Sequence, residues 1–299
     1  MRKVTFSIII PCYNVQNTIE PCIKSVLNQS IDKETFEVIL VDDGSTDSTS
    51  SKIMEFANHP NVLIQSLENN RGLSVARNTG ISVSNGSILC FLDSDMTVGS
   101  TWLEIFRNRF EDKSIVGVVG DCRLPADVKP NKLDHYFYSS IRGARQFSKE
   151  AILGFQWFLF NNTALRRFVI EKVGLFNEDY VSYGGEDTEL AIRIWESFPN
   201  GLRTSANAFS EHHHQRSLKD FLQTMEYYGE TNFPRLINAF PKYKKQLGGD
   251  WINTMKGYLF FNPIIGILVP ILDRFINSYL LVRYQVIYSV IKGARNSNK

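Results

Sequence analysis

Three stretches of the sequence decide the fold: VTFSIIIPCYN at residues 4–14, FEVILVDDGS at residues 36–45, and ILCFLDSD at residues 88–95. Each begins with an apolar run that is typical of a buried strand and ends in polar residues. Segments with a helical pattern separate the apolar runs. Alternating strands and helices predict βαβ units, and therefore an α/β protein with a mostly parallel sheet that is covered by helices on both faces.

The same alternation continues along the chain. Further strands are expected at residues 62–66 and 115–119. Helices are expected at residues 18–28, 46–57, 73–84, 101–111, 163–171, 186–197 and 217–228. In an open α/β sheet, ligands bind outside the carboxyl ends of the strands. The polar groups that follow three strands, at residues 11–14, 42–45 and 93–95, are therefore expected to share one edge of the sheet.

Composition limits which partners and which cellular location are expected for the chain. The chain has 299 residues, of which 33 are basic and 31 acidic, with a formal net charge of +2. We expect no nucleic-acid partner, because domains that bind nucleic acid through charge are usually strongly basic. The four cysteines form no C-x-x-C pair, and Met1–Phe6 leads directly into a strand pattern without a secretory signal. Reduced thiols and a cytoplasmic location are therefore expected.

Two acidic segments and a histidine run are candidate sites. Asp93 and Asp95 suit a hard divalent cation that prefers oxygen ligands, although a polar turn has the same pattern. Residues 184–187, Gly-Gly-Glu-Asp, open a predicted helix. The glycines would allow a ligand to approach the backbone, but the acidic pair is equally typical of an ordinary first turn. The run at 212–214 is either structural or metal-binding.

These segments follow one another in a characteristic order: Pro11 to Asn14, Asp42 to Ser45, Arg71 to Asn78, Asp93 to Asp95, and the Gly-Gly-Glu-Asp turn. Together they resemble the inverting family 2 glycosyltransferases of the GT-A fold, over roughly residues 4–235. The resemblance implies a metal-dependent transfer of a sugar from a nucleotide sugar, with UDP favoured, to a hydroxyl of a glycan. The histidine run is similar to members that act on lipid-linked or cell-surface glycans.

The resemblance also implies a role for individual residues. Asp187 matches the catalytic base, with Glu186 as its neighbour. Asp95, together with Asp93, would hold Mn²⁺ or Mg²⁺. His212 matches a third metal ligand, with His214 as the alternative and His213 pointing elsewhere. The residues implied on the nucleotide side are Tyr13 and Asp43 at the base, Arg71 and Arg77 facing the nucleotide, Asp93 at the ribose or a metal-bound water, and the neighbouring Pro11, Asn14 and Ser94.

Other classes of protein fit less well. A Rossmann dehydrogenase needs a glycine-rich turn after the first strand, but the first glycine of the chain is Gly44. A P-loop NTPase needs a Gly-Lys pair, which the sequence lacks. A sugar nucleotidyltransferase resembles chains with a glycine- and arginine-rich loop where this chain has residues 11–14. A catalytically inactive nucleotide- or glycan-binding relative is the remaining alternative, although the acidic residues of the active family are present.

The C-terminal part differs in character. The apolar run at 257–272 has only 16 residues and contains Pro263 and Pro270, whereas a membrane-spanning helix needs about 20. From Trp251 onward there are six basic residues and one acidic residue. At 100° per residue, a polar stripe is expected on a following helix, formed by Arg274, Asn277, Ser278, Gln285, Ser289 and Lys292.

We therefore divide the chain into a catalytic domain at residues 1–235 and a helical tail at residues 236–299. The catalytic domain would comprise a nucleotide-binding half, 1–120, and an acceptor-side half, 121–235. The tail is expected to bind the inner face of the cell membrane peripherally, since apolar and basic residues together favour an anionic lipid surface. The alternative is a pair of helices packed on the catalytic domain or on a second subunit.

Overall fold

The computed structural model describes residues 4–147, 151–213, 215–276 and 278–297. The chain forms two compact units. The first, which we call the sheet unit, comprises Met1–Asp127, Gly143–Val181 and Glu186–His214. The second, the helical unit, comprises Val128–Arg142, Ser182–Gly185 and Gln215–Lys299. This division differs from the boundary predicted at residue 235, because the segment from 215 to 235 packs with the C-terminal helices.

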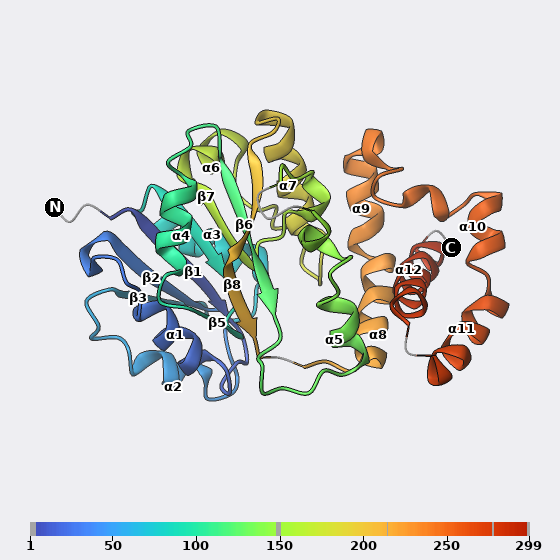
Figure 1. Cartoon of the computed structure of the whole chain (residues 1–299), viewed down its shortest axis with the longest axis horizontal. Coiled ribbons are helices and arrows are strands. Elements are labelled where there is room, and N and C mark those ends of the chain that lie inside the picture. The colour runs from blue at the N-terminus through green and yellow to red at the C-terminus, as the bar shows by residue number, and fades with distance from the viewer. Residues whose placement is uncertain (1–3, 148–150, 214, 277, 298–299) are drawn as a thin grey trace. The chain divides into compact units, whose positions relative to one another are not determined.

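The sheet unit contains a mixed sheet in the order β3-β2-β1-β4-β7-β6-β8-β5 (Figure 1). Its strands are β1 (Phe6–Cys12), β2 (Phe36–Asp42), β3 (Val62–Ser66), β4 (Ile88–Leu92), β5 (Met96–Val98), β6 (Gly117–Arg123), β7 (Asn162–Arg166) and β8 (Leu202–His212). Strands β1 to β4 pair in parallel, as the alternating pattern predicts. Strand β7 is antiparallel to both β4 and β6, so the helix expected at 163–171 is wrong in its first part.

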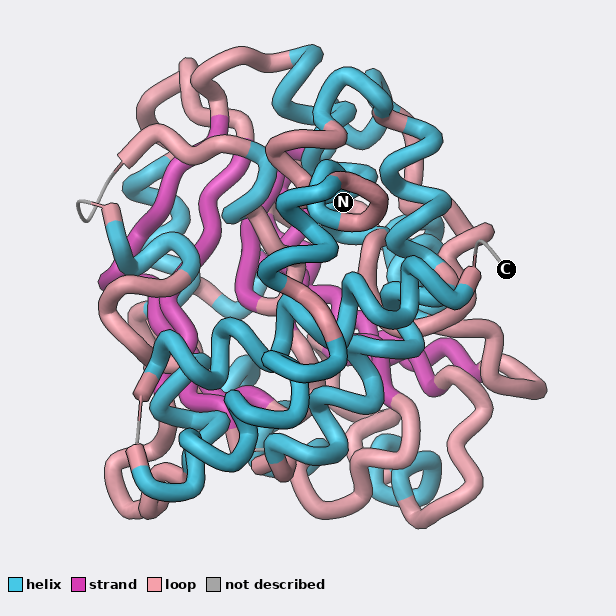
Figure 2. Tube along the Cα trace, turned by 90° about the vertical axis from the view of Figure 1, so that its right-hand side faces the viewer, coloured by secondary structure: helices cyan, strands magenta, loops and turns pink. Residues whose placement is uncertain are grey.

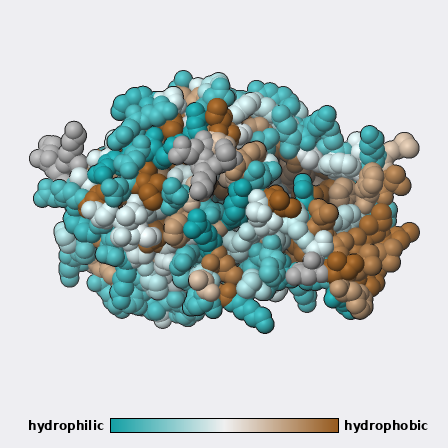
Figure 3. Space-filling view, in the orientation of Figure 1, coloured by the Kyte–Doolittle hydropathy of each residue, from teal (hydrophilic) through white to brown (hydrophobic). Residues whose placement is uncertain are grey.

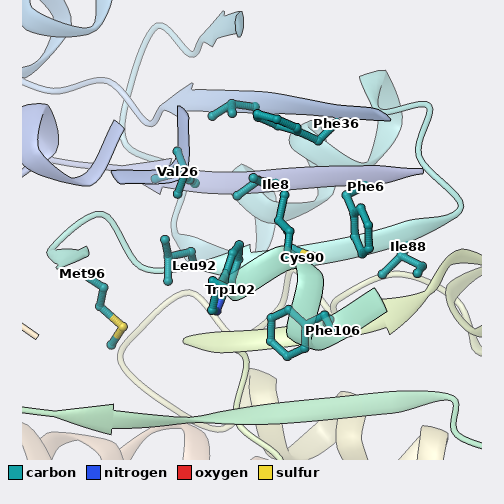
Figure 4. Close-up of a cluster of buried hydrophobic side chains, with 14 of the residues drawn as sticks. Phe6, Ile8, Val26, Phe36, Ile88, Cys90, Leu92, Met96, Trp102 and Phe106 are labelled. Atoms are coloured by element: carbon teal, nitrogen blue, oxygen red, sulfur yellow. The ribbon is translucent and has the colours of Figure 1, made fainter. Parts of the chain in front are cut away.

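Helices cover both faces of this sheet. They are α1 (Ile19–Leu27), α2 (Thr49–Met54), α3 (Leu73–Val83), α4 (Trp102–Arg109), α6 (Arg167–Val173) and α7 (Glu186–Ser197), with 3₁₀ turns at Lys33–Thr35, Gly143–Gln146 and Phe155–Trp157. Alternate residues of β1 face opposite sides. Ile8 and Ile10 belong to a cluster with Val26 of α1 and Trp102 of α4 (Figure 4). Ile9 instead meets Gly80 of α3, which has no side chain and so allows close packing.

The helical unit consists of helices and loops in the residues that the structure describes (Figure 2). Its helices are α5 (Lys132–Phe137), α8 (Leu218–Glu230), α9 (Asn232–Ala239), α10 (Met255–Phe260), α11 (Pro263–Phe275) and α12 (Tyr279–Asn296), with 3₁₀ turns at Pro241–Tyr243 and Gly249–Trp251. Helices α8 and α12 approach so closely that a Cβ at Gly229 would meet the carbonyl of Val290, and one at Gly293 that of Glu226.

The structure corrects part of the polar stripe predicted for the tail. Gln285 and Ser289 are buried, because α12 packs against α5 and α8 through Val282 and Val286, whereas Arg274 and Lys292 are exposed and Asn277 lies outside the described residues. Pro263 begins α11, and Pro270 lies within it. Among the described residues, no helix is both long and apolar enough to cross a membrane.

Candidate active site

The loops that follow β1 and β2 are joined by hydrogen bonds. The Asn14 backbone N–H donates to Ser45 Oγ (3.1 Å), and Asn14 Oδ1 accepts from the Thr46 backbone N–H (2.8 Å). Tyr13 is exposed at this edge, whereas Pro11 is buried within β1. The two polar segments that the sequence analysis selected are thus neighbours at the carboxyl ends of adjacent strands.

Asp43 is buried and holds the loop before α3. Its two carboxylate oxygens accept hydrogen bonds from the backbone N–H groups of Arg71 (2.7 Å) and Gly72 (2.9 Å). Burial raises the pKa of Asp43, and these two N–H groups oppose the rise. The carboxylate therefore organises the loop that carries the exposed Arg71. Its contact with a nucleotide base stays a prediction.

Arg77 of α3 lies at the centre of the site. Only 1% of it is exposed, and its guanidinium faces three carboxyl groups from two distant segments. Nη1 contacts Asp187 Oδ1 at 2.6 Å and Glu186 Oε1 at 3.6 Å, and Nη2 contacts Asp93 Oδ1 at 3.5 Å. Burial disfavours the charged guanidinium, but attraction to Asp187, Asp93 and Glu186 outweighs it and raises the pKa of Arg77. Arg77 thus joins the strand-end carboxylate Asp93 to the carboxylates of α7, and its place beside the nucleotide stays a prediction.

Both oxygens of Asp187 are held in position. Oδ1 accepts from Arg77, and Oδ2 accepts from the backbone N–H of Phe160 (3.0 Å), whose carbonyl in turn accepts from Arg77 Nη2 (3.2 Å). Gly184 and Gly185 precede α7 with φ values of 82° and 99°, a backbone region that favours glycine. This turn fixes where the first residues of α7 begin, so the Asp187 carboxylate has little freedom.

Glu186 has a different environment from its neighbour. Its Oε2 is buried without a hydrogen-bond partner. Burial raises the pKa of Glu186 to about 7, the like charge of Asp187 adds to the rise, and Arg77 opposes it. One guanidinium serves three carboxyl groups, so a buried carboxyl that it does not hold closely keeps a proton more readily than an ordinary glutamate does.

Asp95 meets His212 at the other side of the site. His212 Nε2 lies 3.0 Å from Asp95 Oδ2, and each side chain is 23% exposed. The pairing of β5 with β8 brings Met96 opposite His212, which explains how residues distant in sequence meet. Ser94 is buried between the two aspartates. The imidazole of His213 contacts Thr97 Oγ1 (2.7 Å), and its backbone N–H donates to the carbonyl of Asp95 (2.8 Å). His214 lies outside the described residues.

Asp93 lies between these two groups of residues, and its carboxylate faces Arg77. Burial raises the pKa of Asp93 to about 7, the charge of Arg77 opposes this rise, and the charges of Asp95 and Asp187 add to it. Within the described residues, no group of three His, Cys, Asp or Glu side chains is already arranged to hold a metal ion. The Asp95–His212 pair nevertheless offers a carboxylate oxygen, which suits Mn²⁺ or Mg²⁺, beside an imidazole nitrogen at one partly exposed point.

Arg77 was predicted as a site residue, but its pairing with Asp93, Glu186 and Asp187 was not. A signal was available, because Arg77 shares a helical face with Gly80 and Ile81, which belong to the buried side of α3. An arginine on a buried face requires carboxylate partners. The part played by the Phe160 backbone had no sequence signal, since a main-chain group can be supplied by any residue type.

The family model of glycosyl transferase family 2 matches residues 7–174, which is more than half of the chain. The chain belongs to glycosyl transferase family 2. The family that the motifs resemble is therefore confirmed. The matched region ends before α7 and β8, so the roles of Asp187 and His212 stay predictions.

Curated relatives agree with this membership. Glycosyltransferase AglE of Haloferax volcanii is 30% identical over 180 residues, which cover 60% of this chain and 58% of AglE. Minor teichoic acid biosynthesis protein GgaA of Bacillus subtilis is 46% identical over 118 residues, covering 38% of this chain and 26% of GgaA. The family 2 chain thus spans less than two thirds of the length of either relative.

Solved structures confirm the GT-A-type fold. S. aureus TarS in complex with UDP superposes with a TM-score of 0.56 at 17% identity, covering 99% of this chain and 92% of the other. The mannosyltransferase PcManGT of Pyrobaculum calidifontis, in complex with GDP-Man and Mn²⁺, superposes with a TM-score of 0.65 at 18% identity, covering 98% and 86%. At these identities the likeness concerns the fold alone.

Proposed function

We propose that this family 2 chain transfers a sugar from a nucleotide sugar to a glycan hydroxyl, with inversion at the anomeric carbon. The observation that carries the proposal is the position of Arg77 between two groups of carboxylates. On one side lies Asp93 of the strand-end motif, and on the other lies Asp187 of α7. An inverting transfer needs a group that neutralises the leaving nucleotide and, separately, a base that faces the attacking hydroxyl.

Asp187 is the proposed base. Its side chain is 17% exposed, against 8% for that of Glu186, so an acceptor hydroxyl reaches Asp187 more readily. The contacts to Arg77 and Phe160 leave lone pairs on both Asp187 oxygens, since each carboxylate oxygen accepts more than one hydrogen bond. Arg77 orients this carboxylate, and Glu186 is the second candidate for the base.

A divalent cation is part of the proposal. Asp95 and His212 would hold it, with Asp93 next to them, and the Mn²⁺ in the PcManGT complex supports a metal in this fold. When bound, such an ion acts as a Lewis acid that neutralises negative charge on a diphosphate. His212, which contacts Asp95 in the structure, would be the second protein ligand of such an ion.

We propose a UDP-linked donor and an acceptor on a lipid-linked or cell-surface glycan. The UDP in the TarS complex supports this nucleotide, and the teichoic acid role in the name of GgaA supports the acceptor class. The buried Asp43, whose carboxylate holds the loop before α3, would recognise the uracil N3–H. The proposed location is the cytoplasm, at the inner face of the cell membrane.

Release of nucleotide from a panel of nucleotide sugars tests this function. The protein is incubated with Mn²⁺ and with each UDP- and GDP-linked sugar in turn, and the released nucleotide is measured with and without excess EDTA. We expect one UDP-sugar to be consumed and EDTA to stop the reaction. Binding of UDP by calorimetry without any release from the panel would favour an inactive nucleotide-binding relative, and undiminished turnover in EDTA would remove the metal from the proposal.

A further inference from the structure

Helix α11 of the helical unit has its apolar face on the outside. Exposed positions recur with helical spacing and are occupied by large apolar side chains: Ile264, Ile267, Leu268, Ile271 and Phe275. The face toward the protein carries Gly266, Val269 and the buried Asp273. A helix that packs on a protein in water normally has the opposite arrangement. The exposed face of α11 is therefore suited to an apolar surrounding.

Helix α10 extends the same surface. Met255 is 90% exposed, and Leu259 and Phe260 are each more than half exposed. In Figure 3 the hydrophobic side chains gather as a continuous area over α10 and α11. Trp251 and Tyr258 lie along this segment and are also exposed. Tryptophan and tyrosine are enriched where a protein meets the boundary between lipid and water.

Side chains of α12, together with Lys132 of α5, hold α10 and α11 in this orientation. Tyr284 of α12 donates a hydrogen bond to the carbonyl of Phe260 (2.9 Å), and its ring stacks on that of Phe261. Asp273 Oδ2 pairs with Lys132 Nζ (3.1 Å) and accepts from Gln285 Nε2 (3.0 Å). These polar contacts lie on the inner side of α11. The apolar face is consequently turned outward by specific bonds.

The charged residues of α10 and α11 favour an anionic lipid surface over a second copy of the chain. Lys256 of α10 and Arg274 of α11 are exposed, and Asp273, the single acidic residue from Trp251 onward, is buried and paired. Asp250 is the nearest exposed acidic residue in the sequence. In a symmetric dimer the same patch of both copies would meet, so these like charges would face each other. An anionic lipid surface instead attracts each of them.

We propose that the α10–α11 surface lies in the headgroup region of an anionic membrane, with α11 parallel to the bilayer plane. A helix of 13 residues is about 20 Å long, which is shorter than the roughly 30 Å hydrocarbon core, so a position in the plane fits its length. Ile264, Ile267 and Phe275 enter the acyl boundary, and Lys256 and Arg274 contact lipid phosphates. This assigns membrane binding to α10 and α11 and not to α12.

Flotation of the full-length protein with phosphatidylglycerol-containing vesicles tests the proposal. We expect the wild-type protein to float and the double variant Ile267→Glu/Phe275→Glu to stay at the bottom, with a fall in partitioning of at least about tenfold for each lost side chain. The matched control is Met54→Glu/Phe168→Glu, which changes two exposed apolar residues of the sheet unit and should float like the wild type. The membrane proposal is independent of sugar transfer, because flotation needs neither donor nor acceptor.

A second set of measurements separates membrane binding from unfolding and from self-association. Thermal unfolding of both double variants shows that they are folded, which is expected because all four positions are exposed. Lys256→Gln/Arg274→Gln should weaken flotation, and neutral vesicles should bind the wild type less than anionic ones. A wild-type protein that stays at the bottom overturns the proposal, as does an equally floating Ile267→Glu/Phe275→Glu variant. So does a wild-type dimer in sedimentation that this variant converts to a monomer.

Discussion

Strand β1 and helix α11 are both apolar runs, yet they have opposite surroundings. All seven residues of β1, FSIIIPC, are buried, because helices cover both faces of the sheet. In α11, PIIGILVPILDRF, only Val269 and Asp273 are buried. Burial of β1 stabilises the fold, whereas α11 contributes an outward surface that folding leaves uncovered. The difference shows that apolar sequence predicts which residues leave water, but not whether protein or another partner covers them.

The largest losses of activity are expected for changes at the carboxyl ends of the strands, just past the buried residues of β1 and its neighbours. Asp95→Ala should abolish transfer, with a loss of at least about 10³-fold in turnover, because the ion that Asp95 is proposed to hold supplies several kcal/mol. Turnover of the variant is measured with Mn²⁺ and the preferred donor. The control is Asp250→Ala, which changes an exposed residue of the helical unit and should leave turnover unchanged. Asp121→Ala is not a suitable control, because Asp121 forms an ion pair with Arg145.

The second prediction distinguishes the two acidic residues of α7. Asp187→Asn should lower kcat by about 10²–10⁴-fold, the usual contribution of a positioned general base, and should leave nucleotide binding by calorimetry unchanged. Glu186→Gln, a change of the same kind at the adjacent residue, is the control and should retain most of the activity. A fully active Asp187→Asn together with an inactive Glu186→Gln would exchange the two roles.

Arg77→Met should destabilise the sheet unit by about 3–5 kcal/mol, because removal of one partner leaves buried carboxylates without their counter-charge. Urea unfolding measures the change. Arg77→Lys keeps the positive charge and should recover part of the loss, although a single ammonium cannot reach Asp187, Asp93 and the Phe160 carbonyl together. Equal stability of wild type and Arg77→Met would mean that the three carboxyls are protonated or hydrated without it.

The contrast between β1 and α11 is tested directly by the same change in both. Ile8→Ala should cost about 2–5 kcal/mol of unfolding free energy, because Ile8 is fully buried and the change leaves a cavity. Ile267→Ala removes the same atoms from a side chain that is 65% exposed, so its cost should stay within about 0.5 kcal/mol. A comparable loss at both positions would show that the α11 surface is covered within the folded protein.

The sequence was sufficient to predict the strand-end residues, because the end of a buried apolar run marks where polar groups can reach a ligand. It also predicted that Asp93, Asp95 and Asp187 belong to one site, but only through the resemblance to a family. The network around Arg77 depends on contacts between α3, β4 and α7, which no local pattern contains. The polar stripe predicted for the last helix was wrong at Gln285 for a related reason. Gln285 donates a hydrogen bond to Asp273 inside the helical unit, so this polar residue faces inward.

The smallest expected effect concerns the proton on Glu186. Its pKa of about 7 in the folded protein lies above the ordinary value of 4.5, so the folded state binds the proton more tightly than the unfolded chain does. The resulting stability is complete below pH 4.5 and is lost as the pH rises through 7. Glu186→Gln does not ionise, so its unfolding free energy relative to wild type should rise between pH 5 and pH 8, by at most about 3 kcal/mol. Urea unfolding at both pH values measures this. The exposed Glu111→Gln is the control, and a difference for Glu186→Gln that is the same at both pH values would contradict a buried, proton-holding carboxyl.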